Sequence, residues 1–224
     1  MPLIIILAEC GLELIPKEIR QQSAVKRHLS HKNYSSQLLD NALHHSAMNN
    51  LSNKEKRGRP DIAHLCILNA LGSSLNKSGS LELFFHTIRN RIYRINSEIR
   101  ITRNYNRFKG LMAKLLIDND IIVDDLPLIS RFHGDISKLI KSFENPQITI
   151  LSSKGKQIKN FSDLFPHNSS RNNIAIIGGF QKGNFSKEIL SLSDNLVSIS
   201  EYQLDAWVAV NKVISYYEIT HNIL

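Results

Sequence analysis

The stretch that decides the fold is IAIIGGFQKGNFSKEILSLSDNLVSISEYQLDAWVAVNKVISYY, residues 174–217. It opens on an unbroken apolar run, 174–177, which is too short for a helix and suits a buried parallel strand. Three glycines follow within 178–183, where they permit a sharp turn and let a ligand lie against bare backbone. A second short strand at 196–200 precedes a helix at 204–217. Because that helix is apolar around most of its circumference, we expect it to pack against a sheet or a second subunit.

The glycine loop does not match the dinucleotide-binding fingerprint. Its spacing is G-G-x-x-x-G and it lies late in the chain, whereas G-x-G-x-x-G belongs to the first strand-to-helix turn. Composition alone leaves two interpretations, an ordinary tight turn and a ligand-binding loop.

The composition indicates a globular protein with a polyanionic partner. The 224 residues suffice for one large domain or for a domain with a sizeable insertion. A hydrophobic content of 42% with 21% charged residues is typical of soluble globular chains, and a net charge of +8 favours a polyanion. Cys10 and Cys66 lack metal-like spacing and give no reason to infer a disulfide, which suits a reducing cytosol. The apolar run 3–7 is far too short to span a bilayer and has no basic leader, so we expect a core strand.

The positive charge is concentrated in residues 54–114. This segment holds 13 Lys or Arg residues and 4 Asp or Glu residues, a net charge of +9, while the rest of the chain has a net charge of −1. Six arginines lie between Arg89 and Arg107, and arginine suits bidentate phosphate contacts. A basic run is usually a solvated face, but concentration on a few elements favours phosphate binding.

Three elements are expected within this basic segment. A helix over 60–72 would begin at Pro60, which suits the first helical turn. Residues 81–95 predict a hairpin with a basic turn. A helix over 103–116 would carry an apolar stripe on one face and three cations roughly 130° away. Those cations are Arg103, Arg107 and Lys114.

The remaining chain is less regular. Residues 121–146 read as a connector with a helical piece at 136–140, and 147–151 as a buried strand that ends in a loop at 152–155. Residues 16–50 read as helical with loop interruptions, and Asp40, His44 and His45 lie close together there. Adjacent histidines on a helix point about 100° apart and cannot both ligate a metal easily, so no metal site is expected.

Separated motifs in a consistent order resemble one enzyme family over nearly the whole chain. They are LLD followed by histidines at 38–45, RGRPDI-x-H at 57–64, RITRNYNRFKGLM at 100–112, and IGGF-x-x-G-x-F with a later S-I-x-x-x-x-L-x-A-W at 177–207. The chain is similar to the SPOUT methyltransferases, the α/β-knot enzymes. Within them it is most similar to the family that N1-methylates a pseudouridine in small-subunit ribosomal RNA during ribosome biogenesis.

The resemblance implies an α/β fold with a parallel sheet and a C-terminal trefoil knot, in a single domain over 1–224. It also implies an inserted basic α+β extension at about 52–100 that binds RNA. Two subunits would pair through the C-terminal helix as a homodimer, with the active site beside that interface. A cytoplasmic location, with small-subunit ribosomal RNA as the partner and neither membrane nor metal, would follow.

The cofactor implied is S-adenosylmethionine, held mainly by backbone groups of three loops. The residues implied are Leu151, Gly178, Gly179, Gly183, Ile199, Ser200, Glu201, Tyr202, Gln203 and Leu204. The loop departs from the commoner form of the family at Gln181, usually proline, and at Asn184, often aspartate. Neither departure removes a glycine.

The resemblance also implies the residues that contact RNA. They are Arg59, Asp61, Arg100, Arg103 and Arg107. Thr102 stands where the family usually has proline, which puts the rigidity of that loop in question. Asp61, with Arg59 beside it, is the candidate general base. Taken from the residues alone, the same pair suits a helix start with a solvated arginine.

The reaction implied is attack by pseudouridine N1 on the sulfonium methyl, which needs mainly alignment and exclusion of water. Pseudouridine N1 is free because its ribose is joined through carbon, whereas uridine N1 is the glycosidic nitrogen. Two alternatives stay open. Another knot methyltransferase, acting on a ribose 2′-OH or another base, would share the cofactor loops, and a non-catalytic assembly factor would need only the basic face.

Overall fold

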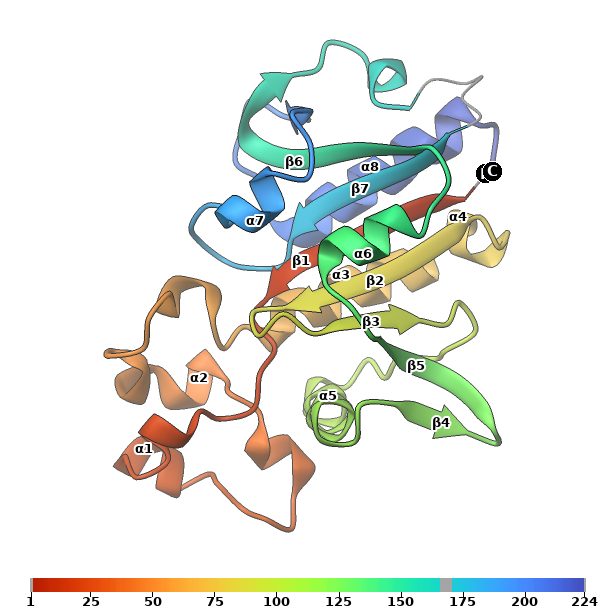
Figure 1. The fold of residues 1–224 in the computed structure, drawn as a ribbon. Helices are drawn as coiled ribbons and strands as arrows, with labels where there is room; N and C mark the ends of the chain where they lie inside the picture. The colour runs from red at the N-terminus through yellow and green to blue at the C-terminus, as the bar shows by residue number, and fades with distance from the viewer. Residues whose placement is uncertain (1, 166–170, 224) are drawn as a thin grey trace.

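One mixed β-sheet is the frame of the molecule (Figure 1), and the computed structural model describes residues 2–165 and 171–223. The strands in this part of the chain are β1 (Leu3–Cys10), β2 (Leu81–Thr87), β3 (Ile92–Ile95), β4 (Ile121–Val123), β5 (Leu126–Phe132), β6 (Pro146–Gln157), β7 (Asn172–Gly178) and β8 (Leu196–Ser198). Their order in the sheet is β4-β5-β3-β2-β1-β7-β6-β8. The five strands from β2 to β8 are parallel, and β3, β5 and β4 add an antiparallel edge.

The central strands are buried on both faces. Every residue of β1 is buried, because successive side chains enter cores on opposite sides of the sheet. Leu3 and Ile5 pack into one core, and Ile4 and Ile6 into the other. Since β1 pairs in parallel with both β2 and β7, the buried strands expected at 3–7 and 174–177 are confirmed.

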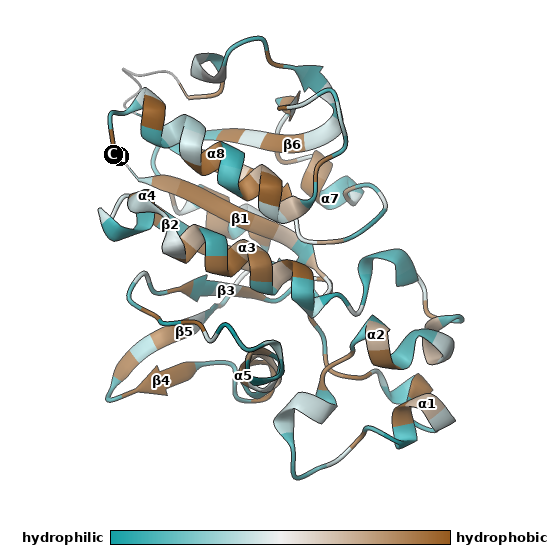
Figure 2. Cartoon of the chain, turned by 180° about the vertical axis from the view of Figure 1, so that it is seen from behind, coloured by the Kyte–Doolittle hydropathy of each residue, from teal (hydrophilic) through white to brown (hydrophobic). Residues whose placement is uncertain are grey.

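Helices cover both faces of the sheet. The core on one side includes residues of α3 (Pro60–Gly72), α5 (Tyr105–Asp118) and α8 (Ala206–Thr220), and Figure 2 shows α3 and α8 lying across the same face. The short α4 (Ser74–Lys77) follows α3. The other side is covered by α6 (Ile136–Lys141) and α7 (Lys187–Leu190). The helix expected over 60–72 is confirmed at both ends.

The N-terminal segment after β1 forms a lobe of short turns beside the sheet (Figure 1). Its helical pieces are η1 (Lys17–Ile19), α1 (Ser23–Lys26), η2 (Tyr34–Gln37), α2 (Asn41–His44), η3 (His45–Met48) and η4 (Lys54–Lys56). Side chains such as Ile19, Leu39 and Met48 give this lobe a small core of its own. Within 16–50 these short pieces cover about half of the residues, so the expected helical segment with loop interruptions is found, but no piece is longer than four residues.

The prediction that residues 121–146 form an irregular connector is wrong for the first half of that range. Residues 121–132 form the hairpin of β4 and β5, which extends the sheet beyond β3. The turn between them consists of Asp124 and Asp125, both with positive φ, at 48° and 61°. Two consecutive residues of that conformation make the tight turn that matches strand twist. The helical piece at 136–140 is confirmed as part of α6.

Other expected boundaries also change. Residues 152–155 are not a loop, because β6 continues to Gln157 with a register shift against β8 between Leu151 and Lys156. The helix expected from 103 begins at Tyr105, with the side chain of Asn104 accepting a hydrogen bond from the backbone N–H of Arg107. Arg103 therefore lies before the helix.

The C-terminal helix begins at Ala206 instead of 204 and is less apolar on its outer side than expected. Val210, Val213 and Tyr217 are buried, whereas Asn211 and Ser215 are exposed.

In the described ranges, no helix combines the length and the apolarity needed to cross a membrane.

Candidate active site

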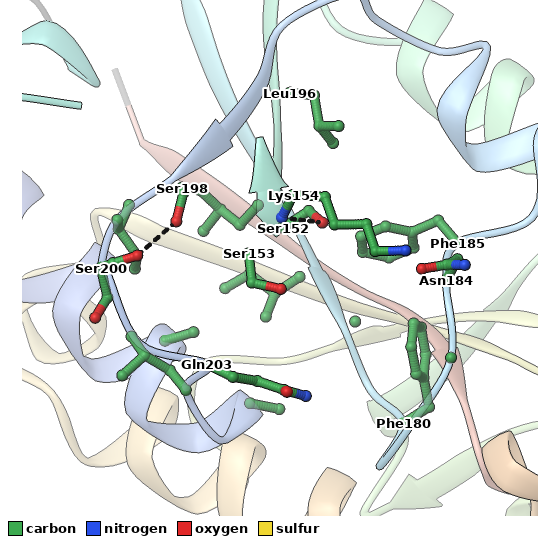
Figure 3. Close-up of a pocket in the computed structure, with 18 of the residues that line it drawn as sticks. Ser152, Ser153, Lys154, Phe180, Asn184, Phe185, Leu196, Ser198, Ser200 and Gln203 are labelled. Atoms are coloured by element: carbon green, nitrogen blue, oxygen red, sulfur yellow. Dashed lines mark hydrogen bonds between the residues drawn. The ribbon is translucent and has the colours of Figure 1, made fainter. Parts of the chain in front are cut away.

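A pocket of about 400 Å³ opens where β6, β7 and β8 approach their carboxyl ends. Leu190 of α7 and Ala206 and Ala209 of α8 complete its walls. Open α/β sheets bind ligands at the carboxyl ends of their parallel strands, and the volume suits a cofactor-sized molecule. The glycine loop after β7 forms one side of the pocket (Figure 3).

Most of the predicted cofactor residues line this pocket. They are Leu151, Gly178, Gly183, Ile199, Ser200, Tyr202, Gln203 and Leu204. Gly179 and Glu201 do not line it. A Cβ at Gly179 would lie 2.3 Å from Cys10 Sγ, so this glycine lets the end of β7 pack against β1. Glu201 is exposed.

The pocket also contains side chains that were not assigned from the sequence. Among them are Ser152, Ser153, Lys154, Phe180, Asn184, Phe185, Leu196 and Ser198. Figure 3 shows the aromatic rings of Phe180 and Phe185 on one side of the space and Ser198 and Ser200 on the other. The two rings meet edge to face at 5.5 Å, and Ser198 Oγ donates to the Ser200 carbonyl at 2.7 Å. The two phenylalanines belong to the motif IGGF-x-x-G-x-F, so the sequence could have indicated that they line the pocket.

A buried ion pair lies beneath the glycine loop. Lys56 Nζ is 2.7 Å from Glu9 Oε2, and both side chains are nearly inaccessible to solvent. Glu9 Oε1 also accepts a hydrogen bond from the backbone N–H of Ser186 at 3.1 Å, at the end of the loop. Lys56 Nζ lies 4.6 Å from the centre of the Phe180 ring, and its Cε would be 3.3 Å from a Cβ at Gly183. One lysine therefore contacts the loop at several points.

The backbone of Glu9 supports this arrangement. Its φ of 55° is left-handed, an uncommon conformation for a residue other than glycine. Such conformations persist where the surrounding structure fixes them, and they gather at functional sites. Here the conformation lies within β1, where the register with β2 shifts between Leu7 and Cys10.

Arg59 and Asp61 form a bidentate ion pair at the start of α3. Arg59 Nε donates to Asp61 Oδ1 at 2.9 Å and a terminal guanidinium nitrogen donates to Oδ2 at 2.6 Å. Hydrogen bonding to Asp61 raises the pKa of Arg59, so the guanidinium stays charged. The side chains are 21% and 38% exposed, so solvent and ligands can reach both. The carboxylate does not accept from the helix N–H groups and is engaged by the arginine instead.

The backbone connects this ion pair to the glycine loop through Gly11. The N–H of Arg59 donates to the carbonyl of Gly11 at 3.2 Å, and the N–H of Gly11 donates to the carbonyl of Gly179 at 3.4 Å. A Cβ on Gly11 would lie 2.7 Å from the Lys56 carbonyl, so the close approach requires glycine.

Arg100, Arg103 and Arg107 are all exposed, and none of their side chains forms an ion pair among the described residues. Arg107 lies in the first turn of α5, and the loop that carries Arg100 and Arg103 is held at Thr102. The Thr102 carbonyl lies 2.8 Å from His64 Nε2, and its hydroxyl accepts from the N–H of Asn104 at 3.3 Å. These bonds fix the backbone where the family usually has proline.

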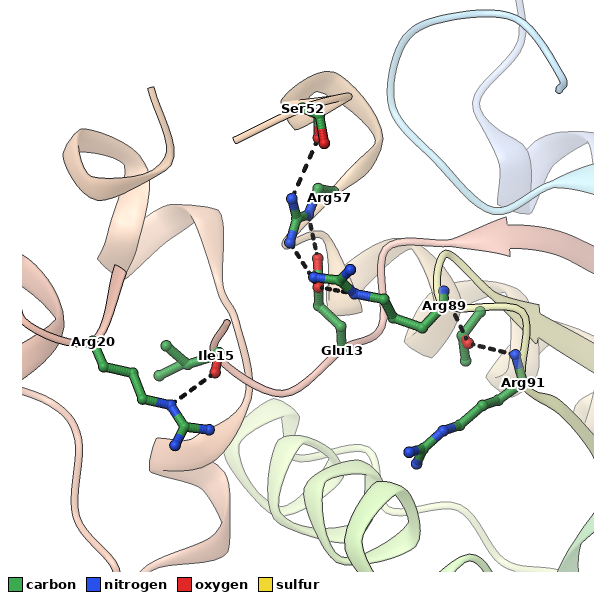
Figure 4. A network of polar contacts seen from close by, with 8 residues as sticks. Glu13, Ile15, Arg20, Ser52, Arg57, Arg89 and Arg91 are labelled. Atoms are coloured by element: carbon green, nitrogen blue, oxygen red, sulfur yellow. Dashed lines mark hydrogen bonds and ion pairs between the residues drawn. The ribbon is translucent and has the colours of Figure 1, made fainter. Parts of the chain in front are cut away.

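Other cations of the basic segment have structural partners. Figure 4 shows Arg57 and Arg89 converging on Glu13. Arg57 binds both carboxylate oxygens, at 2.5 and 2.8 Å, and Arg89 Nε lies 2.9 Å from Oε2. Glu13 and Arg57 are buried. The net charge of the segment therefore overstates the number of cations available to a ligand.

The cluster of Asp40 and the histidines has a structural role as well. Asp40 Oδ2 is 2.9 Å from Lys109 Nζ and accepts from the Tyr105 hydroxyl at 3.1 Å, while the N–H of Asp40 donates to His44 Nδ1. Burial is the main cause that raises the pKa of Tyr105, so its hydroxyl stays protonated and donates. The described residues hold no group of three His, Cys, Asp or Glu side chains placed to bind a metal ion.

Comparisons with known proteins identify the family of the chain. A model of the EMG1/NEP1 methyltransferase family matches residues 5–218. The chain is 42% identical to a Staphylothermus marinus protein named ribosomal RNA small subunit methyltransferase Nep1, over all of this chain and 98% of that protein. It is 36% identical to the protein of that name from Methanothrix thermoacetophila, with 95% and 94% covered.

A solved structure has the same fold. The crystal structure of Archaeoglobus fulgidus Nep1 bound to S-adenosylhomocysteine superposes with a TM-score of 0.84 at 31% identity, covering 98% of this chain and 99% of that one. The α/β architecture with its eight-stranded sheet is thus the architecture of that protein. By its sequence and its fold, the chain belongs to the EMG1/NEP1 methyltransferase family.

Proposed function

We propose that this protein transfers a methyl group from S-adenosylmethionine to N1 of a pseudouridine in small-subunit ribosomal RNA. The observation that carries the proposal is the backbone connection, through Gly11, between the glycine loop beside the pocket and the partly exposed pair of Arg59 and Asp61. Relatives named ribosomal RNA small subunit methyltransferase Nep1 support the RNA and the reaction. The related structure with S-adenosylhomocysteine supports the cofactor.

The pocket suits the cofactor chemically. The aromatic rings of Phe180 and Phe185 offer apolar surface for an adenine, and the hydroxyls and amides around them offer hydrogen-bond partners. The cofactor would be held by the predicted residues that line the pocket: Leu151, Gly178, Gly183, Ile199, Ser200, Tyr202, Gln203 and Leu204. Gly179 and Glu201 do not line the pocket and would act through their neighbours in the same loops. When bound, S-adenosylmethionine supplies an electrophilic methyl group on sulfur.

The chain's own residues would then orient the nucleotide and move one proton. N1 of pseudouridine would form a bond to the methyl carbon as the bond between that carbon and the cofactor sulfur breaks, which leaves S-adenosylhomocysteine. N1 would also lose its proton, and Asp61 is the candidate that accepts it. Because Asp61 is paired with Arg59, we propose that the arginine moves onto an RNA phosphate and so leaves the carboxylate more basic for accepting the proton. In this way RNA binding would free the base.

The direct test is incubation of the protein with methyl-labelled cofactor and a ribosomal RNA hairpin that carries pseudouridine. We expect label in the RNA, and mass spectrometry of the nucleosides should identify N1-methylpseudouridine. The same hairpin with uridine should stay unlabelled. A 2′-O-methylated nucleoside or another methylated base would replace this proposal with a different methyltransferase activity. Cofactor binding without any methylation would favour an assembly factor.

We further propose the finer features of the family: the trefoil knot, the homodimer through α8, an RNA-binding extension at about 52–100, and a cytoplasmic location. The exposed Tyr202 beside the pocket and Ile219 on α8 support a partner surface there, at 77% and 54% exposure. Within the extension, however, β2 pairs directly with β1, so these residues are part of the sheet. Light scattering of the purified protein should give the mass of two chains, and a single-chain mass would exclude the homodimer.

Substitution of Gly178 by Val is expected to abolish cofactor binding while the protein stays folded. A Cβ at this position would lie 2.9 Å from the Phe180 ring, so the branched side chain would push the ring out of the pocket wall. Cofactor binding would then be lost because the Phe180 ring is displaced, and not because the valine side chain itself occupies the space of the cofactor. Calorimetry with S-adenosylmethionine measures the loss. Gly72→Val is the matched control, because nothing lies within 4 Å of its Cβ position. Wild-type affinity in a folded Gly178→Val protein would contradict the assignment.

Replacing Arg100, Arg103 or Arg107 with Ala is expected to weaken RNA binding by about 1–3 kcal/mol each, the range of charge-assisted hydrogen bonds. Each lost phosphate contact should also reduce the slope of log K against log salt by roughly 0.7 for single-stranded RNA. Filter binding over a salt series provides both values. An unchanged slope in all three variants would mean that these arginines are only solvated.

A further inference from the structure

A shallow recess lies on the outer side of α5, where the turn η2 packs against the helix. Its lining comes from η2 with the two residues before it and from α5, and includes Lys32, Tyr34, Ser35, Arg107, Gly110 and Lys114. A Cβ at Gly110 would lie 4.0 Å from Ser35 Cβ, which is an ordinary contact distance, so the turn packs directly against the helix here. Neither the turn nor the recess was singled out from the sequence.

The lining of the recess is positively charged. Lys32, Arg107 and Lys114 are exposed, no carboxylate is among the lining residues, and the three side chains form no ion pair with any described residue. This distinguishes them from Lys56, Arg57 and Lys109 of the same basic segment, which are buried against carboxylates. The free cations of α5 therefore face this recess.

An aromatic ring stands beside these cations. Tyr34 is 46% exposed, and hydrogen bonds hold the turn that carries it. Asn33 Oδ1 accepts from the N–H and the hydroxyl of Ser35, at 3.0 and 2.8 Å, and the N–H of Ile15 donates to the carbonyl of Gln37 at 2.8 Å. The half-exposed ring is therefore carried by an ordered turn.

We propose that this recess binds an unpaired nucleotide of the RNA substrate other than the methylated one, with the base on Tyr34 and the flanking phosphates on Lys32, Arg107 and Lys114. An aromatic platform between free cations is the chemistry that binds single-stranded nucleic acid. Arg107 belongs both to the recess and to the predicted RNA motif, so the recess continues that surface. The inference rests on the proposed function and extends it to the residues around 31–37.

The test measures RNA affinity with the pseudouridine hairpin and its unpaired flanks. Tyr34→Ala is expected to weaken binding about tenfold, whereas Tyr34→Phe, which keeps the ring, should retain wild-type affinity. Lys32→Ala and Lys114→Ala should each reduce the salt slope by roughly 0.7. Lys138→Ala, an exposed lysine of α6 on the opposite face of the sheet, is the matched control and should change nothing. Affinity for S-adenosylmethionine should be unchanged in every variant.

A second readout locates the contact directly. RNA with 5-iodouridine at single unpaired positions should crosslink to Tyr34 under ultraviolet light, and the peptide over 32–37 should carry the adduct. If Tyr34→Ala and Lys114→Ala bind like the wild type while Arg107→Ala binds more weakly, the recess is not an RNA site. That result leaves the proposed function intact, whereas an unmodified RNA with the wild-type enzyme would refute the function itself.

Discussion

Replacing Asp61 with Asn is expected to lower the rate of methyl transfer about 10²-fold and to leave cofactor affinity unchanged. This is the scale of a lost general base. The substitution keeps the shape of the side chain and part of its hydrogen bonding to Arg59, and it removes the charge. Single-turnover methylation of the pseudouridine hairpin measures the rate, and calorimetry measures cofactor affinity. Asp118→Asn, an exposed carboxylate at the end of α5, is the control.

The pH dependence separates the two roles that the ion pair allows. If Asp61 accepts the N1 proton, the Asp61→Asn rate should recover in part as the pH rises, because solvent then deprotonates N1. If Asp61 only orients Arg59, the deficit should be independent of pH and accompanied by weaker RNA binding, and Arg59→Lys should reproduce it. A normal methylation rate with a lower melting temperature would return Asp61 to the stability of the helix start and remove it from the site.

Replacing Lys56 with Met is expected to reduce the free energy of unfolding by about 3–5 kcal/mol, because Glu9 would be left charged and buried. Affinity for S-adenosylmethionine should fall as well, since Lys56 contacts the Phe180 ring and the loop at Gly183. Chemical denaturation and calorimetry measure the two effects. Lys54→Met, two residues earlier and exposed, should change neither.

A double variant separates stability from loop positioning. Lys56→Met with Glu9→Gln removes both charges, so most of the lost stability should return. Cofactor affinity should stay low, because the contacts with the glycine loop are still missing. Wild-type stability and affinity in the single Lys56→Met variant would show that the ion pair does not hold the loop.

The parts of the fold that the sequence predicts are those governed by local chemistry. The run 174–177 could only be a buried strand, and Pro60 starts α3 where proline is tolerated. The hairpin of β4 and β5 was missed because its strands are largely exposed and carry no apolar alternation strong enough to read. The pair Asp124 and Asp125 could have indicated the turn of this hairpin, because aspartate tolerates the positive φ that the turn requires.

The candidate site was predictable to the extent that its motifs are contiguous. The glycine loop and 199–204 were found because they lie within recognisable strings. The role of Lys56 could not be read, because a lysine in a basic run looks like a solvated charge, and its partner Glu9 lies 47 residues away. Likewise, the recess at Tyr34 depends on packing between η2 and α5, which no local pattern encodes.

The position of Gly11 has a consequence for the order of events. Its two peptide hydrogen bonds make the RNA motif and the methyl-donor loop neighbours along one piece of backbone. If either ligand restrains that backbone, the second ligand has less conformational entropy to remove, so we expect the two binding events to be cooperative. Such coupling is reciprocal, and the RNA must tighten the donor by the same factor by which the donor tightens the RNA. The enzyme would then hold its methyl donor most firmly when the target nucleotide is already in place.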